Sequence, residues 1–136
     1  MKPRIYVDTN VYMDLFEGRK NKFKDLAECA LCTFRQVREK KYDLVISDFV
    51  IEEFTKYCDK KIILNFLKGF KGEQVIKVIS ESKDRKKARK LCSDNFDDAL
   101  HVILALKGKC VFLITQNIKH LGEFNNLIEI CSPESL

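Results

Sequence analysis

The sequence predicts an α/β fold: one domain over residues 1–136, in which a central parallel sheet of four to five strands is flanked by helices. Short apolar runs alternate along the chain with segments whose apolar residues recur at spacings of three and four. This order is typical of strands joined by helical crossovers in a parallel sheet. A length of 136 residues is also common for one domain built on one hydrophobic core.

Five segments have the composition of strands. Residues 43–47 contain three consecutive apolar residues, Leu-Val-Ile, as expected for a strand that helices cover on both faces. Residues 74–80 fit either a strand or a tight connection. Three further strands are expected in short apolar runs, at residues 5–7, 110–114 and 127–131.

Helical periodicity is clearest in residues 22–40, where the apolar side chains form one stripe. Asp48 is expected to open another helix. Ser93 or Asp94 is expected to cap a helix that continues through Lys107. Further short helices are expected over residues 9–16, 62–70 and 82–91.

The composition excludes several classes of protein. Hydrophobic residues make up 46% of the chain and charged residues 33%, with two Pro and five Gly, which excludes disorder and collagen-like repeats. No apolar run approaches the roughly 18 residues that span a bilayer, and the apolar stretch near the N-terminus is too short for a signal peptide. We therefore expect no membrane contact and a cytoplasmic location. The net charge of +5 leans toward a nucleic-acid partner.

Polar residues stand directly after three of the predicted strands. Asp8 follows Ile-Tyr-Val, Ser47 and Asp48 follow Leu-Val-Ile, and the segment from Thr115 to Asn117 follows Val-Phe-Leu-Ile. In parallel α/β sheets, ligands bind beyond the carboxyl ends of the strands. These positions are therefore the first candidates for a functional site.

The predicted helices add acidic residues to this edge. Glu52 and Glu53 lie one turn beyond Asp48. A second group stands near the expected start of the helix that ends at Lys107, and consists of Asp94, Asp97 and Asp98. Asp94 and Asp98 are four residues apart, so we expect them to share a helix face with His101.

Most of these residues also have a structural interpretation. Asp48 and Asp94 are suited to cap helices, and Asp97 suits the positive end of a helix dipole. His101, among apolar neighbours, is more often a hydrogen-bonded packing residue than a ligand. Asp8 differs from the others, because a carboxylate at the inner end of a central strand is partly buried and needs a counter-charge.

Four segments, taken in order, resemble the PIN-domain family. They are residues 7–11 (Val-Asp-Thr-Asn-Val), 46–54 (Ile-Ser-Asp-Phe-Val-Ile-Glu-Glu-Phe), 98–105 (Asp-Ala-Leu-His-Val-Ile-Leu-Ala) and 113–121 (Leu-Ile-Thr-Gln-Asn-Ile-Lys-His-Leu). Each segment alone is common, but the four in this order between matching elements are more specific. The resemblance extends from residue 4 to about residue 134.

This resemblance implies a three-layer, Rossmann-like PIN domain and a metal-dependent endoribonuclease. The class includes VapC-type toxins of toxin–antitoxin pairs and housekeeping RNA-processing nucleases. By matching position, the expected metal-binding acids are Asp8, Glu53 and Asp98, with Glu52 as an alternative to Glu53. Hard oxygen ligands of this kind select Mg²⁺ or Mn²⁺.

Asn117 departs from the family pattern, because it stands where many members have a fourth acid. We still expect it among the catalytic residues, together with the three acids, and the number of metal ions stays open. Supporting roles are expected for Thr9, Asn10, Asp94 and Thr115. Of these, Thr115 is expected to act with Asn117 in positioning phosphate or water.

Two functions stay open from the sequence. The first is an endoribonuclease that cleaves RNA, as a toxin or as a housekeeping enzyme. The second is a PIN-fold module that binds RNA or protein without cutting, which Asn117 favours. By resemblance, an antitoxin protein and a second copy of the chain are the expected partners. Two basic runs fit either an RNA contact or a solvated surface: Lys83–Lys90, and the group Arg19, Lys20, Lys22 and Lys24.

Overall fold

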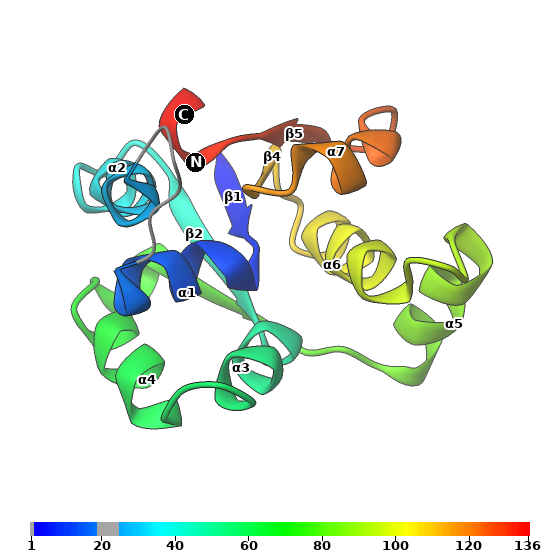
Figure 1. Cartoon of the computed structure of the whole chain (residues 1–136), viewed down its shortest axis with the longest axis horizontal. Helices are drawn as coiled ribbons and strands as arrows, with labels where there is room; N and C mark the ends of the chain where they lie inside the picture. Colours follow the sequence, from blue (N-terminus) through cyan, green and yellow to red (C-terminus); the bar gives the residue numbers. More distant parts are fainter. Residues whose placement is uncertain (1, 19–24) are drawn as a thin grey trace.

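The computed structural model describes residues 2–18 and 25–136. Within them, five strands form one sheet in the order β3-β2-β1-β4-β5, and every neighbouring pair is parallel. The strands are β1 (Arg4–Val7), β2 (Asp43–Ser47), β3 (Val75–Val78), β4 (Phe112–Ile114) and β5 (Glu129–Cys131). The predicted α/β fold with a central parallel sheet is therefore confirmed (Figure 1).

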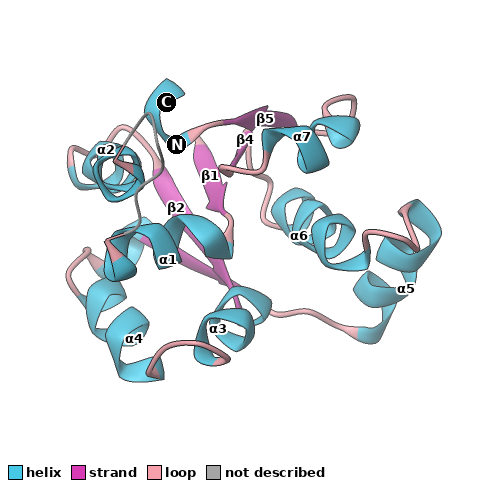
Figure 2. Ribbon diagram, in the orientation of Figure 1, coloured by secondary structure: helices cyan, strands magenta, loops and turns pink. Residues whose placement is uncertain are grey.

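Helices cover the sheet from both sides, which gives the three layers expected. Figure 2 shows α1, α2 and α4 on one side of the strands and α5 and α6 on the other. The helices are α1 (Thr9–Glu17), α2 (Leu26–Arg38), α3 (Asp48–Thr55), α4 (Lys60–Lys68), α5 (Ser82–Leu91), α6 (Phe96–Lys107) and α7 (Ile118–Leu121). Short 3₁₀ turns cover Gly72–Gln74, Gly122–Phe124 and Pro133–Ser135.

Several predicted bounds agree with the structure. β2 and α5 have the predicted ends, and residues 74–80 contain the strand β3 rather than a loop alone. Helix α4 begins two residues earlier than predicted, because the side chain of Asp59 accepts a hydrogen bond from the backbone N–H of Lys61 at 2.9 Å and so caps the helix. The start of the predicted helix at residue 22, and the basic group at residues 19–24, lie outside the described residues.

Two predicted helix caps are wrong, although a helix does begin at Asp48 as predicted. Helix α6 begins at Phe96 after Asn95, because residues 92–95 are used to reverse the chain after α5. Asp94 therefore lies in a turn and shares no helix face with Asp98. Helix α3 is capped by Ser47, whose Oγ accepts from the backbone N–H of Val50 at 3.1 Å, and Asp48 is its first helical residue.

The strand side chains pack into one apolar core. Ile5, Tyr6 and Val7 of β1 are completely buried, as are Leu113 and Ile114 of β4. Aromatic rings from α1, α2 and α4 pack against one another in tilted or edge-to-face pairs, at centroid distances of 4.9 to 6.4 Å; they belong to Tyr12, Phe34 and Phe66. Within residues 2–18 and 25–136, no helix combines the length and the apolar character that crossing a bilayer requires.

The ends of the central strands are held in register where the candidate residues begin. The backbone N–H of Asp8 donates to the carbonyl of Ile114 at 2.9 Å, and the N–H of Thr115 donates to the carbonyl of Cys131 at 2.9 Å. The first residues after β1 and β4 are thereby fixed side by side. This places Asp8 and Thr115 at the carboxyl edge of the sheet.

Candidate metal centre

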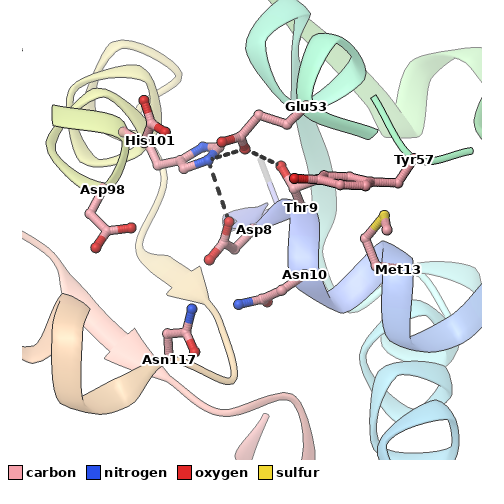
Figure 3. Close-up of a pocket in the computed structure, with 10 residues that line it drawn as sticks. Asp8, Thr9, Asn10, Met13, Glu53, Tyr57, Asp98, His101 and Asn117 are labelled. Atoms are coloured by element: carbon pink, nitrogen blue, oxygen red, sulfur yellow. Dashed lines mark hydrogen bonds and ion pairs between the residues drawn. The ribbon is translucent and has the colours of Figure 1, made fainter. Parts of the chain in front are cut away.

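A cavity of about 380 Å³ opens at the carboxyl edge of the sheet, between α1, α3 and α6 (Figure 3). Most side chains that line it are polar or acidic, and they come from distant parts of the sequence. The lining residues are Asp8, Thr9, Asn10, Met13, Glu53, Tyr57, Asp97, Asp98, His101 and Asn117. Convergence of polar groups from separate elements is typical of a functional site.

Asp8 lines the cavity directly after the end of β1. It is 6% exposed and precedes α1 in an extended conformation, but its side chain does not cap that helix. Instead, the buried Thr115 hydroxyl donates to Asp8 Oδ2 at 2.8 Å. Asp8 Oδ1 lies 3.4 Å from His101 Nε2. Thr115 therefore orients the carboxylate without lining the cavity itself.

Thr115 also connects two asparagines to Asp8. Its hydroxyl oxygen accepts from the backbone N–H of Asn117 at 3.0 Å and lies 3.4 Å from the Asn10 amide nitrogen. The other end of the Asn10 amide, Oδ1, is buried and accepts no hydrogen bond from the described residues. The Asn117 side chain faces the same cavity (Figure 3). A buried oxygen without a donor beside carboxylates suits a site that binds a cation.

Glu53 reaches the cavity from α3 and is held by two donors. Its Oε1 accepts from the Thr9 hydroxyl at 2.6 Å and lies 2.7 Å from His101 Nε2 (Figure 3). Glu52 points elsewhere: its side chain is 60% exposed and lies 4.0 Å from Arg85. Of the two glutamates that the sequence left open, only Glu53 lines the cavity.

His101 joins the carboxylates to a buried polar chain. Its Nδ1 lies 2.7 Å from the Tyr6 hydroxyl, which lies 2.8 Å from Ser47 Oγ. Because an ionised carboxylate can only accept, Nε2 must carry the proton that it shares with Glu53. In the neutral ring Nδ1 is then an acceptor, and Tyr6 is its donor. The strand β1, the N-terminus of α3 and the cavity are linked by this chain.

The crowding of charges shifts the pKa values of three groups. Burial, with the nearby charge of Asp8, raises the pKa of Asp98 above its usual value. Burial opposes protonation of His101, but the carboxylates of Asp8 and Glu53 outweigh it and raise the pKa of the ring. Burial also opposes ionisation of Glu53, yet the hydrogen bonds from His101 and Thr9 lower its pKa overall. Burial and the neighbouring charge of Asp8 thus disfavour the ionised form of Asp98 when no cation is bound.

The donor set fits a divalent cation. Ligand atoms of Asp8, Glu53 and His101 lie within 4.8 Å of one another, and Asp98 lines the same cavity from the first turn of α6. Carboxylate oxygens, together with the buried Asn10 oxygen, are hard ligands of the kind that bind Mg²⁺ or Mn²⁺. His101 can serve as a ligand or, through its N–H, as the residue that holds Glu53 in place.

The structure brings together most, but not all, of the predicted site residues. Asp8, Thr9, Asn10, Glu53, Asp98 and Asn117 line the cavity, and Thr115 supports it from behind. Asp94 does not line it, and belongs to an adjoining hollow formed by residues 93–98, of which Asp97 and Asp98 also line the cavity. His101, interpreted from sequence as a packing residue, contacts two of the acids. Tyr6 was missed, although a tyrosine in a buried strand needs a partner for its hydroxyl.

Comparison with known proteins supplies the class. A family model described as PIN domain matches residues 4–119, and the chain belongs to the PIN domain family. None of the curated proteins matches the sequence.

Two solved structures share the fold at low sequence identity. A toxin–antitoxin complex from Klebsiella pneumoniae has a chain that is 19% identical, with a TM-score of 0.58, and the match covers 95% of this chain and 97% of that one. FitAB bound to an IR36 DNA fragment has a chain that is 15% identical, with a TM-score of 0.57, and the match covers 97% and 96%. At these identities the likeness concerns the fold.

Proposed function

We propose that this protein is a metal-dependent endoribonuclease that hydrolyses phosphodiester bonds of RNA in the cytoplasm, with residues 1–136 acting as a single PIN domain. The observation that carries the proposal is the convergence of Asp8, Glu53 and Asp98 on one cavity of a PIN fold. Three carboxylates in one pocket repel one another, and a divalent cation relieves that repulsion.

Each residue of the cavity has a role in this proposal. Asp8 and Asp98 hold the metal, and Glu53 binds it or orients the attacking water. Bound Mg²⁺ or Mn²⁺ would supply an activated water and offset negative charge at the phosphate. Thr115 fixes the Asp8 carboxylate, while Asn117 donates to a phosphate oxygen or to water.

The fold neighbours favour the toxin of a toxin–antitoxin pair as the biological setting. One neighbour belongs to a toxin–antitoxin complex, and the match covers nearly the full length of both chains. We accordingly propose an antitoxin protein as a partner, and a homodimer as the assembly. Co-purification of the chain with the product of a neighbouring gene, followed by mass measurement of the complex, tests this part separately.

Cleavage of RNA tests the proposed reaction. The purified protein is incubated with a mixture of total tRNA and ribosomal RNA, with Mn²⁺ or with a chelator, and products are mapped by their new ends. We expect cleavage that requires metal, and a loss of at least about a hundredfold in Asp98→Asn, because catalytic groups of this kind contribute factors of that size or more. Asp48→Asn is the matched control, since Asp48 also follows a strand but lies outside the cavity.

A PIN module that binds RNA or protein without cutting is the second candidate. It is favoured by Asn117, an amide in the position where the family resemblance expects an acid. Binding of Mn²⁺ and of RNA with no cleavage of any RNA in the mixture would support this candidate, and undiminished cleavage by Asp98→Asn would contradict the residue assignment.

A further inference from the structure

Helix α5 carries six cationic side chains, and they fall into two groups. The four lysines are exposed to solvent, at Lys83, Lys86, Lys87 and Lys90. The two arginines, Arg85 and Arg89, lie one helical turn apart, and each places its guanidinium over an aromatic ring of a neighbouring helix. Arg85 is half-buried and Arg89 is exposed, and contact with a ring restricts a guanidinium group more than solvent restricts a lysine.

Arg85 connects α5 to the wall of the acidic cavity. Its guanidinium carbon lies 6.0 Å from the centre of the Phe49 ring. The Phe49 ring in turn packs against the His101 ring, with 4.8 Å between the two ring centres. Arg85 also donates to Ser80 Oγ at 3.3 Å and lies 4.0 Å from the exposed carboxylate of Glu52. One aromatic ring therefore separates this cation from a residue of the candidate metal centre.

Arg89 occupies the corresponding place at the N-terminus of α6. Its guanidinium carbon lies 5.3 Å from the centre of the Phe96 ring, and Phe96 directly precedes Asp97 and Asp98, which line the cavity. No carboxylate of the described ranges lies within ion-pair distance of Arg89. Its charge is therefore not neutralised, and the aromatic ring that it contacts directly precedes two carboxylates of the cavity.

We propose that Arg85 and Arg89 bind neighbouring phosphates of a single-stranded RNA and lead the strand into the acidic cavity. This proposal rests on the proposed ribonuclease function and identifies the surface by which its substrate approaches. Phosphates are repelled by the carboxylates of the cavity, so a strand needs fixed cations beside the entrance. Guanidinium groups suit this role, because their paired N–H donors match two oxygens of one phosphate.

The arrangement favours backbone contacts over base contacts. The faces of Phe49 and Phe96 that point toward α5 are covered by the arginines, so they do not offer stacking platforms for bases. The lysines of α5 add a diffuse positive field around the two arginines. Binding at this surface is therefore expected to depend strongly on salt and weakly on sequence.

The test measures RNA binding rather than cleavage. A fluorescently labelled 12-nucleotide RNA of mixed sequence is titrated with the Asp98→Asn protein, which is expected not to cut it. A second titration uses the Asp98→Asn protein that also carries Arg85→Gln and Arg89→Gln. We expect the double substitution to weaken binding about tenfold at low salt. It should also reduce the slope of log K against log salt by about 1.4, since each lost phosphate contact removes about 0.7 for a single strand.

Two further variants separate oriented guanidinium groups from charge alone. Lys41→Gln with Lys71→Gln removes the same charge at the opposite edge of the sheet, just before β2 and β3, and should leave affinity within about twofold. The double variant Arg85→Lys with Arg89→Lys keeps both positive charges but lacks the paired N–H donors. It should bind RNA almost as weakly as the double Gln variant. The melting temperature of each variant is measured alongside.

The outcomes distinguish this proposal from the function on which it rests. The parent protein in these titrations is Asp98→Asn. If the wild type cleaves RNA, but the parent and the Arg→Gln variant bind RNA equally well, the proposed role of the two arginines is wrong and the proposed nuclease function is unaffected. Full affinity in the Arg→Lys variant would also overturn the role of the two arginines, because charge alone would suffice. No RNA binding by the parent, and no cleavage by the wild type, would overturn both.

Discussion

Two cavities in the described part of the protein are lined by residues at the ends of strands, and they differ in chemistry. The acidic cavity, of about 380 Å³, is lined by polar groups from α1, α3, α6 and the chain after β4. A second cavity, of about 610 Å³, lies between α3, α4 and β3 and is lined mainly by apolar side chains such as Ile51, Leu67 and Val75. The lining of the larger cavity also includes Ser47, Asp48, Lys68 and Lys77, but only one of these residues is acidic. Convergence of charge, more than volume, therefore marks the candidate site.

Asp8 and Asp48 hold equivalent positions after neighbouring strands, but their carboxylates make different contacts. Each is the first residue after a central strand, β1 or β2. Both oxygens of Asp48 are used by Ser80, whose N–H donates to Oδ1 at 2.9 Å and whose hydroxyl donates to Oδ2 at 3.0 Å. Asp8 has one oxygen held by Thr115 and the other toward His101 and the cavity. Asp48 therefore joins the start of α3 to the segment that follows β3, while Asp8 keeps an oxygen that can bind a ligand.

The largest effect on stability is expected at the apolar cavity. Asp48→Ala removes two hydrogen bonds to a charged group and should lower the free energy of unfolding by about 2 to 3 kcal/mol. Urea denaturation measures this change, and Mn²⁺ affinity should stay at the wild-type value. A variant as stable as the wild type, or one that no longer binds Mn²⁺, would break the distinction between Asp48 and Asp8.

The next effect is expected in the polar chain behind the acidic cavity. Tyr6→Phe leaves His101 Nδ1 buried without its donor and should cost about 1 to 2 kcal/mol. Loss of that donor also frees the ring to change tautomer, which the ¹⁵N shifts of the imidazole would record. Tyr12→Phe is the matched control, because the Tyr12 hydroxyl is buried and has no partner in the described part of the chain. Equal losses of unfolding free energy in the two variants would show that the hydrogen bond from Tyr6 does not hold His101 in place.

The smallest effect is expected at Asp98 in the absence of metal. Since burial and the charge of Asp8 raise the pKa of Asp98, its ionised form destabilises the fold at pH values above that pKa. Asp98→Asn should therefore unfold at a slightly higher temperature than the wild type at neutral pH with a chelator present. The difference should fade as the pH falls through the raised pKa, because the wild-type carboxyl is then neutral. A lower melting temperature in Asp98→Asn would indicate that Asp98 is structural.

Local sequence patterns predicted most of the fold. β2 and α5 were placed with the correct ends, since a consecutive apolar run and a highly charged helix are both strong local signals. The start of α6 was misplaced because both Ser93 and Asp94 have side chains suited to capping. The turn needed after α5 uses them instead, and Asn95 precedes the helix. Which residue caps a helix depends on where the neighbouring elements leave the chain.

The candidate site was predicted in part. Acids that follow strands are visible from spacing, and Asp8, Glu53 and Asp98 do line one cavity. The choice between Glu52 and Glu53 depends on the rotation of α3, which sequence spacing does not fix. The contacts of His101 with Tyr6 and Glu53 join residues 95 and 48 positions apart, so only the packed fold brings them together.

Calorimetric titration of Mn²⁺ into the wild type and into Asp8→Asn is the most direct test of the proposed metal centre, because it needs no knowledge of the RNA substrate. We expect saturable binding to the wild type that disappears in Asp8→Asn, while both proteins keep the same circular dichroism spectrum. Absence of binding to the folded wild type, or equal binding to the two proteins, would contradict a metal centre built on Asp8.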